Sequence, residues 1–170
     1  MGAYIRENVK KSRRFGIELT NVFNTKDFYI NSSLSLSRNL VYNFNEILYD
    51  YGPDFTDYNT VENIYKTTDL AFSPNIIWAA QADYKLNSRT SVIFNSKYVG
   101  EQYIDNTSSK ERMIDDYLVS NLQIDYNLSS RLFKNAKISF LINNLFDIEY
   151  VSNAWTVSYT HLTLPTNREV

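Results

Sequence analysis

His161 is the only histidine in the chain and therefore the first residue to consider for catalysis. A hydrolase site built from serine and histidine needs a general base, and His161 is the one imidazole that could supply it. The chain contains no cysteine, which excludes thiolate nucleophiles, disulfides and thiolate metal sites. An enzymatic role therefore depends on whether His161 belongs to the folded protein.

The segment that contains His161 has an unusual back-translation. Val157 to Thr166 can be written in codons as GTC TCT TAT ACA CAT CTG ACG CTG CCG ACG, which resembles a transposase-based sequencing-library adapter. Asn167 to Glu169 would then span the sample index, and Val170 would be GTG. This interpretation predicts that residues 156–170 are an artefactual tail unrelated to the fold. It removes His161 from consideration, so we expect no enzyme activity and no catalytic residue.

Carboxylates and tyrosines are interleaved in the segment from Asn45 to Thr68. Hard oxygen ligands suit Ca²⁺, but their spacing here matches no calcium-binding loop. We therefore expect a solvated loop with no metal site, no cofactor and no cofactor-binding residue. The side chains concerned are Glu46, Asp50, Asp54, Asp57 and Glu62, with Tyr49, Tyr51 and Tyr58.

Four basic residues, Lys10, Lys11, Arg13 and Arg14, lie close together near the start of the chain. Such a cluster could meet phosphate groups, or it could be a solvated strand end, which is the commoner case. The formal net charge of the whole chain is −2, so there is no basic footprint for nucleic acid and we expect no nucleic-acid partner.

The elements that would position these residues follow a period of two. Apolar and polar side chains alternate over stretches longer than the usual soluble strand of about 5–6 residues. Short connections alternate with longer ones, which is typical of an up-and-down meander. The sequence predicts an all-β, antiparallel meander of about six strands: Phe15–Phe23, Phe28–Phe44, Leu70–Tyr84, Val92–Tyr98, Leu118–Leu128 and Ile138–Ile142. The expected tight turns are Asn24–Asp27 and Leu86–Arg89, with a modest one at Ser129–Asn135; the expected longer loops are Asn45–Thr68 and Asp105–Arg112.

Strand length and aromatic positions favour a membrane barrel. A tilted transmembrane strand needs about 9–11 residues. Phe23, Phe28, Tyr84 and Tyr126 lie on the apolar faces near the tight turns, where an aromatic girdle is expected. The opposite faces are rich in Asn, Ser and Gln, which suits a hydrated lumen. Another outer-membrane barrel, such as a porin-like channel or a barrel hydrolase, and a soluble β-sandwich binding domain stay open as alternatives.

The sequence LINNLFDIEYVSNAW, Leu141 to Trp155, resembles the C-terminal signature of TonB-dependent outer-membrane receptors. Asn144 to Asp147 and Tyr150 carry the match, and RRFGIEL (Arg13–Leu19) and Tyr98–Leu128 are similar to the same family. The resemblance implies that residues 1–155 are part of the wall of a 22-stranded transmembrane barrel in a bacterial outer membrane.

Such receptors take up scarce nutrients, commonly ferric siderophores or haem. The resemblance implies several partners: outer-membrane lipid and lipopolysaccharide, a plug domain and the remaining barrel strands, which are absent from this chain, and the TonB complex through an N-terminal part that is also absent. We expect the chain alone not to transport.

Overall fold

The structure is a computed structural model that describes residues 9–51, 58–128 and 136–154. In this part of the chain, one antiparallel sheet of seven strands has the order β1-β2-β4-β5-β8-β9, with β3 paired to β2 outside that path. The strands of this sheet are β1 (Ser12–Asn24), β2 (Phe28–Tyr51), β3 (Tyr58–Asp69), β4 (Ile76–Lys85), β5 (Thr90–Val99), β8 (Tyr117–Leu128) and β9 (Ala136–Ile142). The predicted all-β antiparallel meander is confirmed.

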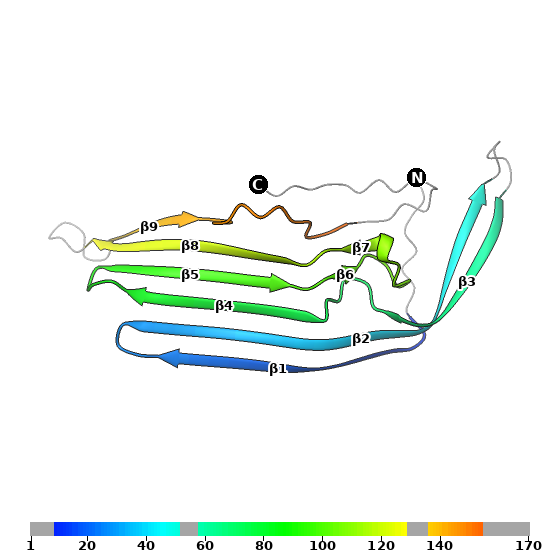
Figure 1. Cartoon of the computed structure of the whole chain (residues 1–170), viewed down its shortest axis with the longest axis horizontal. Helices are drawn as coiled ribbons and strands as arrows, with labels where there is room; N and C mark the ends of the chain where they lie inside the picture. The colour runs from blue at the N-terminus through cyan, green and yellow to red at the C-terminus, as the bar shows by residue number, and fades with distance from the viewer. Residues whose placement is uncertain (1–8, 52–57, 129–135, 155–170) are drawn as a thin grey trace.

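The tight turns lie together at one end of the sheet, on the left in Figure 1, and the longer connections lie at the other end. Thr25 closes the β1–β2 turn, because its Oγ1 accepts from Phe28 N at 3.1 Å. Asn87 closes the β4–β5 turn by accepting from Arg89 N and Thr90 N, both at 2.9 Å. The predicted turn Ser129–Asn135 lies outside the described residues.

One side of the sheet has a continuous stretch without charged side chains, which begins at the tight turns and ends where Arg13 and Arg38 follow on β1 and β2; we call this stretch the apolar face. Residues directly opposite one another in an antiparallel pair point to the same side, so the register Leu34↔Trp78↔Tyr98↔Leu118 defines it. The apolar face comprises Phe15, Ile17, Leu19, Asn21, Phe23, Phe28, Ile30, Ser32, Leu34, Leu36, Ile76, Trp78, Ala80, Ala82, Tyr84, Thr90, Val92, Phe94, Ser96, Tyr98, Leu118, Ser120, Leu122, Ile124, Tyr126, Leu128, Ala136, Ile138, Phe140 and Ile142.

Small residues cross the middle of the apolar face. Ser32 lies opposite Ala80, which lies opposite Ser96 and then Ser120. The hydroxyls of Ser96 and Ser120 are 2.9 Å apart, and Trp78 Nε1 donates to Ser32 Oγ at 3.0 Å. These polar groups on the apolar face therefore find hydrogen-bond partners within the sheet, as an apolar environment requires.

The reverse side, which we call the polar face, carries amides, hydroxyls and charges. Its members include Asn31, Ser33, Gln81, Asp83, Asn95, Lys97, Asn121, Gln123 and Asp125. Side chains bridge neighbours along these strands: Gln81 Nε2 donates to Asp83 at 2.9 Å, and Gln123 Nε2 donates to Asp125 at 2.8 Å. The two faces of the sheet therefore match the division into an apolar and a polar side that the sequence predicts.

Two sequence expectations about strand limits are wrong. The segment Asn45–Thr68 is not a loop: β2 runs on to Tyr51 and pairs with β3 in a long hairpin. Its polar residues hide the alternation, and the pairing is held by the backbone ladder and by contacts such as the Phe44–Tyr65 ring stack at 6.3 Å. The predicted strand Leu70–Tyr84 begins only at Ile76, because Pro74 has no backbone N–H and Phe72 has a positive φ of 50°.

A second, much smaller sheet lies at the end with the longer connections. It pairs β6 (Gln102–Tyr103) with β7 (Met113–Ile114), and the 3₁₀ helix η1 (Lys110–Arg112) lies between them. Ile104, Ile114 and Ala154 form a small buried cluster there. A β-sandwich would need a second large sheet over the first, and the described residues contain none. None of their helices is long and apolar enough to cross a membrane.

Candidate functional site

The middle of the polar face forms a hollow of about 430 Å³. β2, β4, β5 and β8 supply its floor, and the segment that follows β9 supplies one wall. Four side-chain amides contribute to the lining, which consists of Asn31, Ser33, Ala79, Ala80, Gln81, Asn95, Ser96, Lys97, Tyr117, Val119, Asn121, Tyr150 and Ser152. Such a surface offers many hydrogen-bond donors and acceptors to water or to a polar molecule.

Among the described residues, Lys97 is the one charged side chain in the lining of this hollow. Its side chain is exposed, and its register neighbours Ala79 and Val119 are uncharged. The carboxylates of Asp83 and Asp125 lie nearer the tight turns, where Asp125 pairs with Lys137 at 3.2 Å. The described lining therefore carries one positive charge.

Two tyrosines form the wall of the hollow next to β8. The rings of Tyr117 and Tyr150 are stacked, with centroids 4.5 Å apart and planes 24° apart. Tyr150 reaches this position because the chain after β9 continues beside β8, where Leu145 N donates to Ser120 O at 2.7 Å (Figure 1). The stack fixes one side of the hollow at the end with the longer connections.

The turn after β9 is formed by the residues that carry the family resemblance. Asn144 has a positive φ of 48°, which asparagine tolerates better than most residues. Its side chain clamps Ile148: Nδ2 donates to Ile148 O at 3.1 Å, and Oδ1 accepts from Ile148 N at 3.0 Å. The Asn-Leu-Phe-Asp motif therefore has a backbone role here, since it ends β9 and directs Tyr150 to the hollow.

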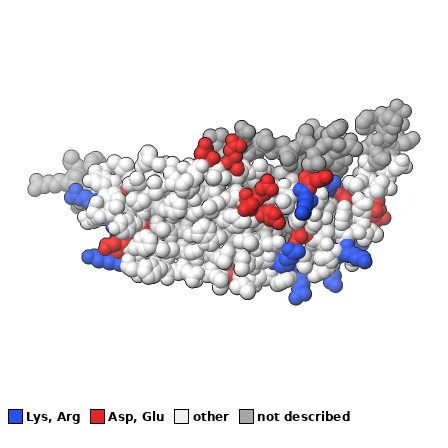
Figure 2. Space-filling model, viewed as in Figure 1, with Lys and Arg blue, Asp and Glu red and all other residues white. Residues whose placement is uncertain are grey.

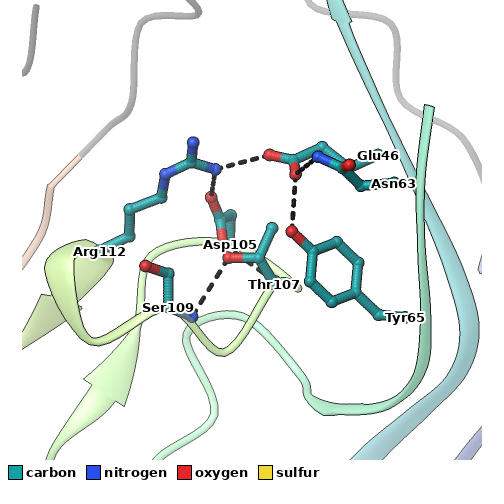
Figure 3. Close-up of polar contacts among 7 residues, drawn as sticks. All are labelled: Glu46, Asn63, Tyr65, Asp105, Thr107, Ser109 and Arg112. Atoms are coloured by element: carbon teal, nitrogen blue, oxygen red, sulfur yellow. Dashed lines mark hydrogen bonds and ion pairs between the residues drawn. The ribbon is translucent and has the colours of Figure 1, made fainter. Parts of the chain in front are cut away.

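A second cluster, which we call the clasp, joins the β2–β3 hairpin to the segment Asp105–Arg112 (Figure 3). Arg112 Nη1 donates to Glu46 Oε1 at 2.7 Å and to Asp105 Oδ2 at 2.8 Å. Glu46 also accepts from Tyr65 Oη at 2.9 Å and from Asn63 Nδ2 at 3.4 Å. One guanidinium thus connects β2 with the loop between β6 and β7.

The loop side of the clasp is ordered by its own hydrogen bonds. Thr107 donates to Asp105 Oδ1 through its backbone N at 3.0 Å and through its hydroxyl at 2.6 Å. Ser109 N donates to Thr107 Oγ1 at 3.2 Å (Figure 3). The same loop reaches the base of β3, where Ser108 Oγ accepts from Asp69 N at 2.7 Å. The carboxylate of Asp105 is therefore held in place for Arg112.

Protonation in the clasp follows from these contacts. The hydrogen bond to Glu46 raises the pKa of Arg112 above its ordinary value, although burial opposes this, and Asp105 adds to the rise. Burial raises the pKa of the Tyr65 phenol, and its hydrogen bond to Glu46 raises it further. Arg112 therefore stays cationic and Tyr65 stays a hydrogen-bond donor at neutral pH.

The structure separates the acidic residues that the sequence analysis considered together. Glu46 belongs to the clasp, whereas Glu62 lies on β3 and accepts from Asn45 Nδ2. Asp54 and Asp57 lie outside the described residues, and for Asp50 only the backbone is described. Within the described part of the chain, no group of three or more candidate ligands could hold a metal ion.

The basic cluster is divided between the two faces of the sheet, as the register of β1 shows. Arg13 is on the same side as Phe15 and Ile17, whereas Arg14 is on the opposite side. His161 and the predicted tail 156–170 lie outside the described residues.

Arg112 is the functional candidate that the sequence analysis did not single out. Its partner Glu46 is 66 residues away in the sequence. No local spacing connects the two, so the contact appears only once the β2–β3 hairpin is in place.

Comparison with known proteins found similarity among solved structures alone. No protein-family model and no curated protein matches the sequence. Among solved structures, the ferric-catecholate import receptor Fiu from E. coli K12, in its closed form, is similar with a TM-score of 0.45 and 16% sequence identity. The match covers 85% of this chain and 25% of the receptor chain, so this chain spans about a quarter of the length of that protein.

Proposed function

We propose that this chain is part of the wall of an outer-membrane β-barrel. The observation that carries the proposal is the apolar face, which crosses six strands without a charged side chain while the reverse side is polar. Phe23, Tyr84 and Phe140 on this face are 57%, 48% and 60% exposed, so no other element of the described chain covers them. Large exposed apolar surfaces of this kind indicate contact with lipid or a partner.

The dimensions of the apolar face support a lipid environment. β4 and β5 have 10 residues each. At about 3.4 Å per residue and a tilt of about 40°, such a strand spans about 25 Å, which equals the apolar band of outer-membrane barrels. Phe28 and Tyr84 make an edge-on ring contact at 6.2 Å near the tight turns, as expected for an interfacial girdle.

We further propose that the barrel is a TonB-dependent receptor for a scarce nutrient, most simply a ferric siderophore or haem. The resemblance of Leu141–Trp155 to the C-terminal signature of that family supports this step. In the complete receptor the polar face would line the lumen, and the hollow around Lys97 would face the interior. The hairpin β2–β3 would stand at the mouth, held by the clasp.

Spin labels on adjacent residues test the membrane orientation. Because the chain has no cysteine, Phe94→Cys and Asn95→Cys each give one labelling site, at nearly the same depth on opposite faces. In phosphatidylcholine vesicles, we expect the label at 94 to collide with oxygen and the label at 95 to collide with a water-soluble nickel chelate. Equal exposure of both labels to the nickel chelate would refute a lipid-facing surface.

The source gene tests the receptor assignment separately. We expect the intact reading frame to encode a plug domain upstream of this region. A reading frame that encodes only a porin-like barrel would overturn the receptor assignment and leave the barrel proposal intact.

A further inference from the structure

Three basic side chains lie in a row on the apolar-face side of the sheet, just beyond its uncharged part. Arg38 lies opposite Phe15, Arg13 lies opposite Leu40, and Lys11 O accepts from Tyr42 N at 3.0 Å. We call Lys11, Arg13 and Arg38 the basic rim. They come from β1, β2 and the residues just before β1, and lie at the end of the sheet with the longer connections. In Figure 2, Lys and Arg side chains lie towards the two ends of the molecule, whereas Asp and Glu side chains also lie near its middle.

The charged ends of two of these side chains, Lys11 and Arg13, lie over aromatic rings. The Arg13 guanidinium carbon is 5.1 Å from the centre of the Phe15 ring, and Lys11 Nζ is 5.5 Å from the centre of the Tyr42 ring. A basic group that lies over an aromatic ring at the edge of an apolar surface can keep its charge in a polar layer while the ring stays in the apolar one. The geometry therefore fits the boundary between acyl chains and headgroups.

The charge of the basic rim is only partly neutralised. Among the described residues, its one ion pair joins Arg38 to Asp69, with Nη1 3.3 Å from Oδ1, and the Arg38 side chain is still 50% exposed. Lys11 and Arg13 are exposed as well. Three cations against one carboxylate leave a net charge of about +2 at the place where the apolar surface ends. This charge favours binding of a phosphate group there.

We propose that the basic rim binds the phosphate groups of anionic membrane lipids. The proposal rests on the proposed function, because it requires the apolar face to lie in lipid. It differs from a general attraction of a basic chain to an anionic membrane, since it assigns the interaction to one side of the sheet. Arg14, the neighbour of Arg13, points to the polar face and should not contribute.

Quenching of Trp78 by brominated lipids tests the proposal. The chain has two tryptophans, so Trp155→Phe leaves Trp78 alone, on the apolar face opposite Leu34 and a few residues from Arg38. Vesicles of brominated phosphatidylglycerol mixed with ordinary phosphatidylcholine, and the reverse mixture, give the relative affinity for the anionic lipid. We expect a clear preference for phosphatidylglycerol, and Arg13→Gln should lower it about fivefold, since one basic residue near an anionic surface contributes about 1 kcal/mol.

Arg14→Gln is the matched control, because it removes the same charge from the adjacent residue on the other face. We expect it to leave the preference unchanged. Equal losses in both variants, or no preference in the parent chain, would overturn the proposal. Unchanged quenching by brominated phosphatidylcholine in both variants would show that they are inserted correctly. A Trp78 that neither brominated lipid quenches would instead refute the lipid-facing surface itself.

Discussion

Removing the guanidinium of the clasp should loosen the β2–β3 hairpin without unfolding the main sheet. Arg112→Ala deletes the contacts to Glu46 and Asp105, whose side chains are 12% and 23% exposed, while that of Arg112 is 30% exposed. Hydrogen bonds between charged groups contribute about 1.5–3 kcal/mol when buried and less when solvent reaches them. Glu46 keeps Tyr65 as a donor, so it is not left without a partner.

The expected cost is therefore about 2 kcal/mol for the two contacts together, below the roughly 3–5 kcal/mol for a fully buried pair because solvent reaches these side chains. A cost of this size raises the opening constant of the hairpin about 30-fold. This opening constant is measured by hydrogen exchange of the backbone amides of β3 and of the part of β2 after Phe44, in the vesicle-inserted chain. Arg112→Lys keeps the positive charge but loses the planar guanidinium fork. In this variant the amides of the hairpin should exchange about fivefold faster than in the parent chain.

The neighbouring exposed residue supplies the control. Lys110→Gln removes a positive charge from the same 3₁₀ helix. Its exchange rates should equal those of the parent chain. If Arg112→Ala accelerated exchange in the hairpin no more than Lys110→Gln does, the clasp would not hold the hairpin, and its ion pairs would be worth no more than an exposed pair.

Three further predictions address the turn after β9, the β1–β2 pairing and the apolar face. Asn144→Ala should release the chain after β9 and separate the Tyr117 and Tyr150 rings, which would appear as a loss of near-ultraviolet circular dichroism. Asn144→Gly should keep the positive φ and lose only the side-chain hydrogen bonds to Ile148. Gly16→Val should speed hydrogen exchange of β1 about tenfold or more, because a Cβ at this position would lie 2.5 Å from Leu36 O; Glu18→Val is the control on the same face. Expressed without detergent, the chain should aggregate, and a monodisperse soluble monomer would contradict the lipid-facing surface.

The period-two pattern was enough to predict the main sheet, because its apolar positions all lie on one side. Trp78, Phe94, Leu122 and Phe140 alternate with polar neighbours, and the register places all four on the apolar face. The same logic failed for β3, where Tyr65 and Ile64 are neighbours on opposite faces and neither face is uniformly apolar. Alternation predicts a strand only where one side of the sheet meets a different solvent from the other.

The clasp could not be predicted in this way, and the reason also explains its place in the fold. The sequence predicts a loop at Asn45 and Glu46, whereas in the structure both lie on β2 and the long hairpin keeps Glu46 within reach of Arg112. A hairpin that leaves a sheet has no apolar surface to pack against, so its direction must come from specific polar contacts. Arg112 supplies them from a loop that is itself ordered by Asp105 and Thr107. The hairpin direction is therefore set by a few charged contacts, whereas the main sheet is set by the distribution of apolar side chains along many strands.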